Sequence, residues 1–191
     1  SEPTIRSLKG EIQAAGDYAM AGGENYREIV LTLPERTETP FRGSHVNVEN
    51  ALVHARTTDR TDKAGRKILY VEEIQSDWHQ RGRKHGYWGP KVRQIGGPKI
   101  VTHGVVPDAP FKDTKTWTSL AVKRIMQIAV DEGYDAVAFT KGETAHEVVS
   151  MPLKSAKEYY DKIVLSVVKK HTKAPIGKTN FGYTAFLGDV E

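Results

Sequence analysis

The first half of the chain alternates apolar and polar residues in a way that predicts β-strands. The run Tyr26–Leu33 alternates isoleucine and leucine with other residues and is followed by a proline. Two further strand-like runs are Ala51–Arg56 and Lys67–Gln75. The TTDRTDKAG segment between them has the Asp, Lys and Gly residues of a hairpin connection. We therefore expect three neighbouring antiparallel strands.

Apolar residues recur at helical spacing in the second half of the chain. In Thr116–Glu132 they line one face, and Gly133 follows directly as a typical helix terminator. A strand is predicted immediately afterwards at Ala136–Thr140, and a short final strand near Tyr183–Leu187.

Two other segments also have helical spacing. Lys154–His171 is predicted to be the last helix, with Ser155 and Glu158 at the spacing of a capping box. Thr4–Ala15 is predicted to be a short amphipathic helix that stops at Gly16.

Together these elements predict an α/β (α+β) fold with a mixed, largely antiparallel sheet flanked by helices. A chain of 191 residues suits a single hydrophobic core. We expect one domain over residues 1–191, with 1–22 as an N-terminal helical extension and 23–191 as the core.

Composition excludes several classes of protein. No apolar run approaches the roughly 18 residues that cross a bilayer, and the start of the chain lacks the apolar block of a secretory signal. The chain has no cysteine, which excludes disulfides, thiolate metal sites and a cysteine nucleophile. No histidine pair has zinc spacing, so we expect no structural zinc. A cytoplasmic location is expected.

Charge is unevenly distributed along the chain, although the net charge is only +4. Neither Asp nor Glu occurs between Trp78 and Pro107, and none occurs between Lys162 and Gly188. The first of these stretches opens with Arg81, Arg83 and Lys84 on a predicted short basic helix. Such a face is either solvated and free of contacts, or it binds an anion such as a nucleotide or nucleic acid.

The densest polar cluster is the segment VEEIQSDWHQ. If the strand continues through it, alternation places Glu73, Gln75, Asp77 and His79 on one face. Carboxylates beside an imidazole suit general acid–base chemistry, which makes Glu73, Asp77 and His79 candidate catalytic residues. A dedicated cation site usually has more than two carboxylates, so a metal is not expected.

An alternative explanation of this cluster is structural. Ser76 or Asp77 would cap the following helix, and Glu73 would pair with a neighbouring Arg or Lys. On the preceding strand His54 and Arg56 alternate, so in a hairpin they would face Glu73 or Gln75. The candidate substrate-binding or anion-binding residues are therefore Gln75, His54, Arg56, Arg81, Arg83 and Lys84.

Several common site motifs are missing from the sequence. It has no GxxxxGK[ST] phosphate loop, no GxGxxG after a strand and no GxSxG elbow.

Five blocks of the chain resemble a domain of large polyvalent proteins of bacteriophages and prophages. The blocks are ENYREIVLTLP, VEEIQSDWHQRGRKHGY, VPDAPFKDTKTWTSLAVKR, EGYDAVAFTKGE and AKEYYDKIVLSVVKKH. The resemblance implies an accessory role during infection, in the cytoplasm of the host cell, for a protein that can be delivered with the virion.

A more distant similarity is to acetyltransferases of the GNAT type. Their plan is an antiparallel meander, a helix that leads to a GYDxVxxT strand, and a helix with a Tyr near its start; Ala121–Thr140 and Lys157–Tyr160 are similar to these last parts. The resemblance implies acyl transfer. Such enzymes bind the cofactor pyrophosphate at a glycine-containing turn before the first of those helices. Here that turn is KDTKTWTSL, which has no glycine.

Three functions follow from these patterns. The first is a transferase for a nucleotide-containing or protein substrate, with Glu73 or Asp77 as base and the basic helix as anion clamp. The second is a non-catalytic module that inhibits a host defence protein or binds nucleic acid. The third is an ADP-ribosyltransferase-like enzyme, which ranks lower because no Ser-Thr-Ser strand signature occurs. The sequence leaves the cofactor and the oligomeric state open.

Overall fold

The computed structural model describes residues 4–8, 20–33, 40–93, 100–149 and 151–187. Its strands are β1 (Thr4–Leu8), β2 (Glu24–Thr32), β3 (Ala51–Thr61), β4 (Lys67–Gln75), β5 (Pro90–Arg93), β6 (Ile100–His103), β7 (Ala136–Phe139), β8 (Ile176–Thr179) and β9 (Gly182–Phe186). Its helices are α1 (Asp77–His85), α2 (Thr114–Asp131), α3 (Gly142–Val149), α4 (Leu153–Ala156), the π-helix η2 (Lys157–Val164) and α5 (Leu165–His171).

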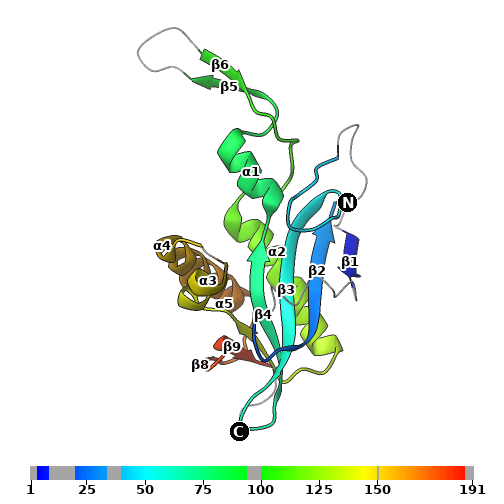
Figure 1. Ribbon diagram of the computed structural model, residues 1–191, viewed down its shortest axis with the longest axis vertical. Helices are drawn as coiled ribbons and strands as arrows, with labels where there is room; N and C mark the ends of the chain where they lie inside the picture. The colour runs from blue at the N-terminus through cyan, green and yellow to red at the C-terminus, as the bar shows by residue number, and fades with distance from the viewer. Residues whose placement is uncertain (1–3, 9–19, 34–39, 94–99, 150, 188–191) are drawn as a thin grey trace.

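Within the described residues, seven strands form one mixed sheet in the order β1-β2-β3-β4-β7-β9-β8. Neighbouring strands are antiparallel except for the central pair β4 and β7, which is parallel. The mixed, largely antiparallel α/β fold is thus confirmed, as is the antiparallel order of β2, β3 and β4. Strands β5 and β6 form a separate hairpin that extends away from the sheet beyond α1 (Figure 1).

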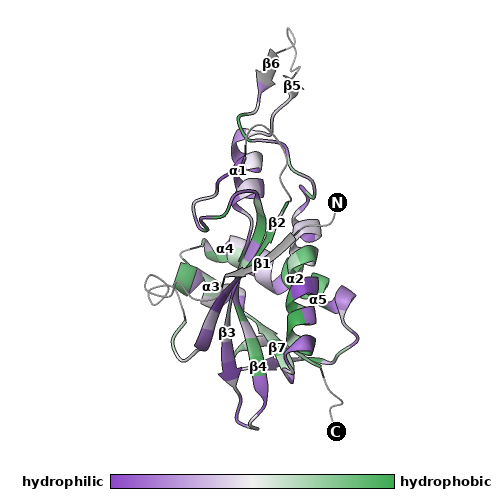
Figure 2. Cartoon of the chain, turned by 90° about the vertical axis from the view of Figure 1, so that its right-hand side faces the viewer, coloured by the Kyte–Doolittle hydropathy of each residue, from purple (hydrophilic) through white to green (hydrophobic). Residues whose placement is uncertain are grey.

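The main hydrophobic core lies between one face of the sheet and helices α2 and α5. These helices lie together on the same side of the sheet (Figure 2). Alternate residues of β3 such as Val53 and Ala55 face Val122 and Ile125 of α2, and all four are buried. The apolar residues that recur at helical spacing in the sequence are therefore the ones that α2 buries in this core.

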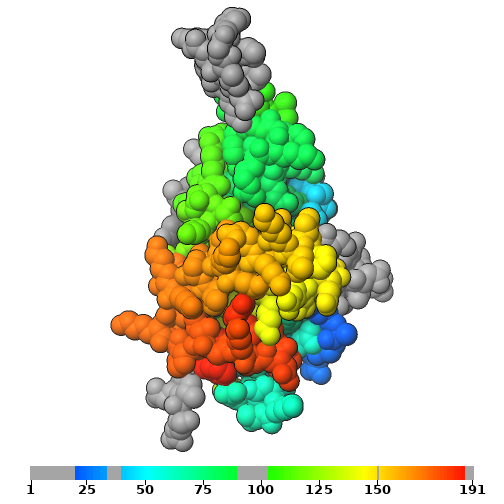
Figure 3. Space-filling model, turned by 90° about the vertical axis from the view of Figure 1, so that its left-hand side faces the viewer, coloured from blue at the N-terminus to red at the C-terminus, as the bar shows by residue number. Residues whose placement is uncertain are grey.

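The parallel pair β4 and β7 is short, so the end of β4 has β3 on one side but, among the described residues, no strand on its β7 side. Its register runs from Ile68 opposite Ala136 to Val71 opposite Phe139, while β4 continues to Gln75. Helices α3, α4 and η2 lie beside this end of β4, above β8 and β9 (Figure 3). The buried Tyr160 of η2 belongs to this group.

The expected N-terminal helix at Thr4–Ala15 is wrong where the structure describes it. Residues Thr4–Leu8 form strand β1, with Ile5 opposite Leu31 of β2. Five residues with an apolar pair three apart fit a strand or a helix, and pairing with the exposed edge of β2 decides between them. This segment therefore belongs to the sheet and not to a helical extension; residues 9–15 lie outside the described residues.

The last helix confirms its predicted place but not its predicted cap. It begins at Leu153 after Pro152, with no side-chain capping bond, so the capping box of Ser155 and Glu158 is wrong. Glu158 instead pairs with Lys162, at 2.6 Å between Oε2 and Nζ. Helix α3 and strand β8 were not predicted from the sequence. Among the described residues, no helix is long and apolar enough to cross a membrane.

Candidate active site

The candidate site lies where β4 ends and α1 begins. Ser76 is the N-cap of α1: its Oγ accepts a hydrogen bond from the backbone N–H of His79 at 3.2 Å. The same hydroxyl donates to the carbonyl of Leu52 on β3 at 2.5 Å. The junction is therefore fixed both to the helix and to the neighbouring strand, and the predicted Ser76 cap is confirmed.

Asp77, the first residue of α1, does not act as the cap but holds a loop. Its Oδ2 accepts the backbone N–H groups of Ser44 at 2.7 Å and His45 at 3.0 Å. Its Oδ1 lies 2.6 Å from Nδ1 of the His45 ring. A Cβ at Gly43 would lie 2.6 Å from Oδ2, so the loop approaches the carboxylate as closely as a glycine permits.

The His45–Asp77 pair has the geometry of a general base. Burial by itself would raise the pKa of Asp77, but the hydrogen bonds from His45 and Ser44 outweigh it and lower that pKa below its usual value. An ionised carboxylate only accepts hydrogen bonds, so Nδ1 of His45 carries the proton and Nε2 has the free lone pair. The Asp77 side chain is 7% exposed, whereas that of His45 is 55% exposed.

Glu73 and Arg56 form a buried ion pair beside this dyad. They are opposite each other in the register of β3 and β4, and the Arg56 guanidinium contacts Oε2 of Glu73. Burial raises the pKa of Glu73, and Arg56 offsets only part of that effect. The sequence-based alternative that Glu73 pairs with a neighbouring Arg or Lys is thus confirmed.

His54 and Gln75 are also opposite each other, two residues further along the two strands and on the same face. The His54 ring is stacked against that of His45, with 6.1 Å between ring centroids. Burial lowers the pKa of His54 to about 4, against the opposite effect of Asp77, so this ring is neutral at pH 7. Nε2 of Gln75 is buried and has no hydrogen-bond partner among the described residues.

The predicted alignment of His79 with Glu73, Gln75 and Asp77 is wrong. The strand ends at Gln75, and from Asp77 onward successive residues turn by helical steps and no longer alternate. Nδ1 of His79 lies 2.7 Å from the Tyr87 hydroxyl. Burial lowers the pKa of His79 to about 4, helped by the nearby cations.

The three predicted cations of α1 are all exposed, and they are not brought together at the dyad. Arg81 lies over the ring of Phe41, 5.7 Å from its centroid, and donates to the carbonyl of Arg42 at 3.4 Å. Arg83 and Lys84 are in the last turn of α1.

Sequence reasoning missed His45, whereas Tyr160 was already indicated by the similarity to the GNAT plan. His45 was not predicted as a site residue because it belongs to a polar loop without periodicity. The only local indication of a fixed loop is the Gly-Ser-His sequence after the apolar Phe41. Tyr160 is buried at the end of β4. Burial raises its pKa, and the Glu73 carboxylate raises it further.

The described residues contain no group of three or more His, Asp or Glu side chains that could hold a metal ion. The chemistry that the site itself offers is proton transfer, and the amide nitrogen of Gln75 has no hydrogen-bond partner among the described residues. In comparisons with known proteins, no family model matches the chain and no curated protein sequence matches it.

Proposed function

We propose that this domain is a group-transfer enzyme that activates a nucleophile on a protein or nucleotide-containing substrate, with the His45–Asp77 pair as its base. In line with its resemblance to phage polyvalent proteins, it would act beside invading DNA in the host cytoplasm. One observation carries the proposal: a buried carboxylate lies 2.6 Å from Nδ1 of a half-exposed imidazole.

The direction of proton transfer follows from this geometry. Nε2 of His45 accepts a proton from a hydroxyl or amine of the substrate, which makes that group a stronger nucleophile. The ring becomes an imidazolium, and the adjacent Asp77 carboxylate stabilises its charge. The buried Asp77 also fixes the ring orientation, because it holds the backbone of His45 as well as the ring.

Glu73 is better suited to positioning than to proton transfer. Its carboxylate is engaged with Arg56, and its side chain is only 8% exposed. The unpartnered amide of Gln75 is the polar group best placed to bind a substrate oxygen, because a buried donor without a partner costs about 1–3 kcal/mol until it is bonded.

The position of the parts is similar to the GNAT plan, with one departure. Helix α2 leads to β7, and the buried Tyr160 of η2 comes close to Glu73 at the end of β4. At the first turn of α2, however, the Asp113 carboxylate accepts the N–H of Thr116 at 3.1 Å. A cofactor pyrophosphate would meet a negative charge there, so we propose that any acyl donor binds elsewhere.

A labelled-donor assay tests the proposal. The purified chain is incubated with bacterial lysate and, in separate reactions, with labelled acetyl-CoA, NAD or ATP. We expect one donor to transfer its label to a protein or nucleotide acceptor. His45→Asn should reduce the rate by about 100-fold or more, the range typical of losing a general base. Because the ring is half-exposed, the stability of His45→Asn should stay within about 1 kcal/mol of the original.

His146→Asn is the matched control. His146 is also exposed, and its ring bonds only the carbonyl of Met151, at 2.7 Å. Transfer that persists in His45→Asn would overturn the role of the dyad. Failure of all three donors would favour the non-catalytic binding module.

A further inference from the structure

We propose that a surface track from Arg42 to Lys170 binds single-stranded nucleic acid. The track consists of three adjoining pockets, and it does not depend on the His45–Asp77 pair being catalytic. The first pocket, of about 480 Å³, is lined by residues that include Arg42, Arg81, His85 and Trp88. The second, of about 580 Å³, runs from Trp88 to Phe111.

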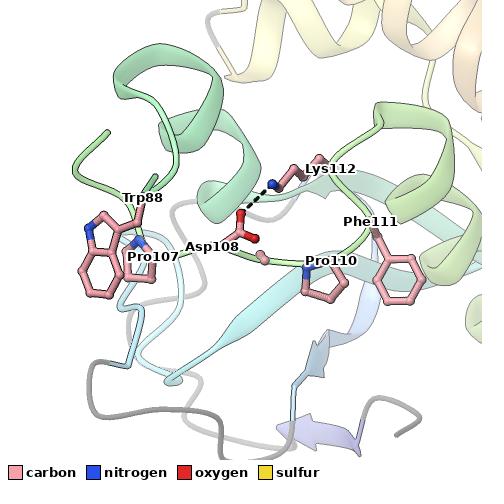
Figure 4. Close-up of a pocket in the computed structure, with 7 residues that line it drawn as sticks. Trp88, Pro107, Asp108, Pro110, Phe111 and Lys112 are labelled. Atoms are coloured by element: carbon pink, nitrogen blue, oxygen red, sulfur yellow. Dashed lines mark ion pairs between the residues drawn. The ribbon is translucent and has the colours of Figure 1, made fainter. Parts of the chain in front are cut away.

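The third pocket, of about 510 Å³, begins at Phe111 and continues between helices α2 and α5. Shared lining residues show that the pockets are neighbours. The first two share Trp88 and Pro107, and the last two share Phe111. Figure 4 shows the middle pocket, with Trp88 and Phe111 at opposite ends and the Asp108–Lys112 ion pair between them.

Trp88 is an exposed aromatic ring on a fixed backbone. Its side chain is among the exposed large hydrophobic groups, at 48%. Its backbone N–H donates to the carbonyl of Val106 at 2.7 Å, and Val106 in turn donates to Gly86 at 3.1 Å. A large flat ring that is left in solvent on a fixed backbone can stack on a nucleobase, and the fixed backbone reduces the conformational entropy lost on binding.

Phe111 is exposed in spite of an unfavourable backbone conformation. Its φ is +60°, in the left-handed region that bulky residues rarely adopt, and its side chain is 38% exposed. Such a conformation costs on the order of 1–2 kcal/mol. Burial of the ring does not compensate for this cost, which suggests that the ring is placed there for contact with a ligand.

Cations lie at both ends of the track. The third pocket is lined by Lys115, Lys123 and Lys170, and all three are exposed. Burial, Lys123 and Lys170 together lower the pKa of His171, which lies between the helices and contacts Ser119. In the middle pocket the Asp108 carboxylate is neutralised by Lys112 at 2.5 Å.

This arrangement favours a single strand as the occupant. Cations at intervals neutralise the backbone, while separated aromatic rings stack on bases, and in a duplex the bases are already stacked on one another. The exposed Asp108 of the middle pocket is paired with Lys112, and no acid among the described residues lines the third pocket with its three lysines, which favours an anionic occupant over a protein.

Intrinsic fluorescence provides a direct test. The chain has three tryptophans, of which Trp78 and Trp117 are buried, so only Trp88 is accessible to a base. We expect titration with an oligo(dT) of about 12 nucleotides to quench the fluorescence in a saturable way. Anisotropy of a labelled strand should give the same Kd, and log K should fall linearly with log salt.

Variants distinguish the track from general basic attraction. Trp88→Ala should raise the Kd by about 10-fold, the effect of losing one stacked base. Phe111→Asn should weaken binding without loss of stability, because Asn tolerates positive φ. The double change Lys115→Glu with Lys170→Glu should weaken binding more than 10-fold. Lys63→Glu, in the exposed β3–β4 turn, is the control with the same type of charge change.

Three results would overturn the proposal. The first is no saturable binding at 50 mM salt, about the lowest salt at which such affinities are compared. The second is equal or tighter binding of the corresponding duplex. The third is the same loss of affinity in Lys63→Glu as in the double change Lys115→Glu with Lys170→Glu.

Discussion

The two faces of the sheet differ in what they bury. On the face covered by α2 and α5, β3 places Val53 and Ala55 against apolar side chains of the helices. On the opposite face the same strand places His54, Arg56 and Thr58, which are also mostly shielded from solvent. Between Val53 and Thr58, β3 therefore contributes mainly apolar groups to one side and polar or ionisable groups to the other.

Two adjacent carboxylates of β4, Glu72 and Glu73, differ in how completely their surroundings are hydrogen-bonded. Glu72 accepts hydrogen bonds from Thr58 Oγ1 at 2.8 Å and from Met20 N at 3.1 Å, and lies 3.3 Å from Arg60. The Glu72 carboxylate therefore has both its hydrogen-bond donors and a countercharge within the fold. Around Glu73 some groups remain unused, above all the amide of Gln75. The Glu72 carboxylate is thus fully engaged within the fold, whereas the amide nitrogen of Gln75, near Glu73, has no hydrogen-bond partner among the described residues.

The largest loss of stability is expected on the apolar face. Ile125 is fully buried, so Ile125→Ala should lower the free energy of unfolding by about 2–5 kcal/mol through lost burial and the cavity that remains. Urea denaturation measures this value. Val130→Ala on the same helix is the control, because Val130 is 63% exposed and should change stability by less than about 0.5 kcal/mol. Equal losses in the two variants would contradict the assigned core.

The polar face should make stability depend on pH. His54 has a pKa of about 4 in the fold against 6.5 for a free ring, so below pH 6.5 the unfolded chain binds a proton that the folded chain does not. Stability should therefore fall as pH falls from 6.5 toward 4, by up to about 3 kcal/mol. His79 acts in the same direction.

Denaturation curves between about pH 7.5 and about pH 5 in about half-unit steps measure this dependence. The difference between the original chain and His54→Gln separates the ring from carboxylates such as Glu73, whose pKa burial raises. His54→Gln should reduce the dependence of the unfolding free energy on pH, and the part that is due to His79 should remain. An unchanged slope in His54→Gln would show that the ring is not buried in its neutral form.

The smallest loss of stability among these predictions is expected for a substitution at the end of β4. Glu73→Gln keeps the size of the side chain and an acceptor for Arg56 but removes the charge, so stability should fall by about 1–3 kcal/mol. Activity should fall only in proportion to the folded fraction, in contrast to His45→Asn. Thermal melts beside the transfer assay separate the two effects. Glu143→Gln, in a largely exposed pair with Lys157, should cost less than about 1 kcal/mol.

If Glu73→Gln were stable but inactive, the result would support Glu73 as a catalytic residue and would contradict the assignment of His45 as the base.

Much of the fold could be predicted from local patterns. The β3–β4 hairpin and the α2–β7 unit follow from alternation, helical spacing and turn residues that lie within the segments themselves. Strand β1 could not be predicted, because its pairing with β2 depends on residues twenty or more positions away. The π-helical turn of η2 has no local signal either.

Some residues of the candidate site could likewise be predicted from local patterns, and others could not. Glu73, Gln75, His54 and Arg56 come together because hairpin register places them opposite one another, and register can be inferred from sequence. His79 was misplaced because the change from strand to helix at Ser76 changes the period of the side chains. The contact of His45 with Asp77 spans 32 residues, and nothing in the intervening sequence specifies it.

The π-helix η2 also determines how the chain tolerates deletions. It is followed without a break by α5, which carries Lys170 and His171 to α2. A π-turn closes its hydrogen bond one residue further along the chain than an α-turn, so removal of one residue from η2 would restore ordinary α-helical bonding and leave later residues on nearly the same side of the helix. His171 could then keep its contact with Ser119. A single-codon deletion should therefore be tolerated better inside η2 than inside the regular helix α2, where it would rotate all later helical residues by about 100°.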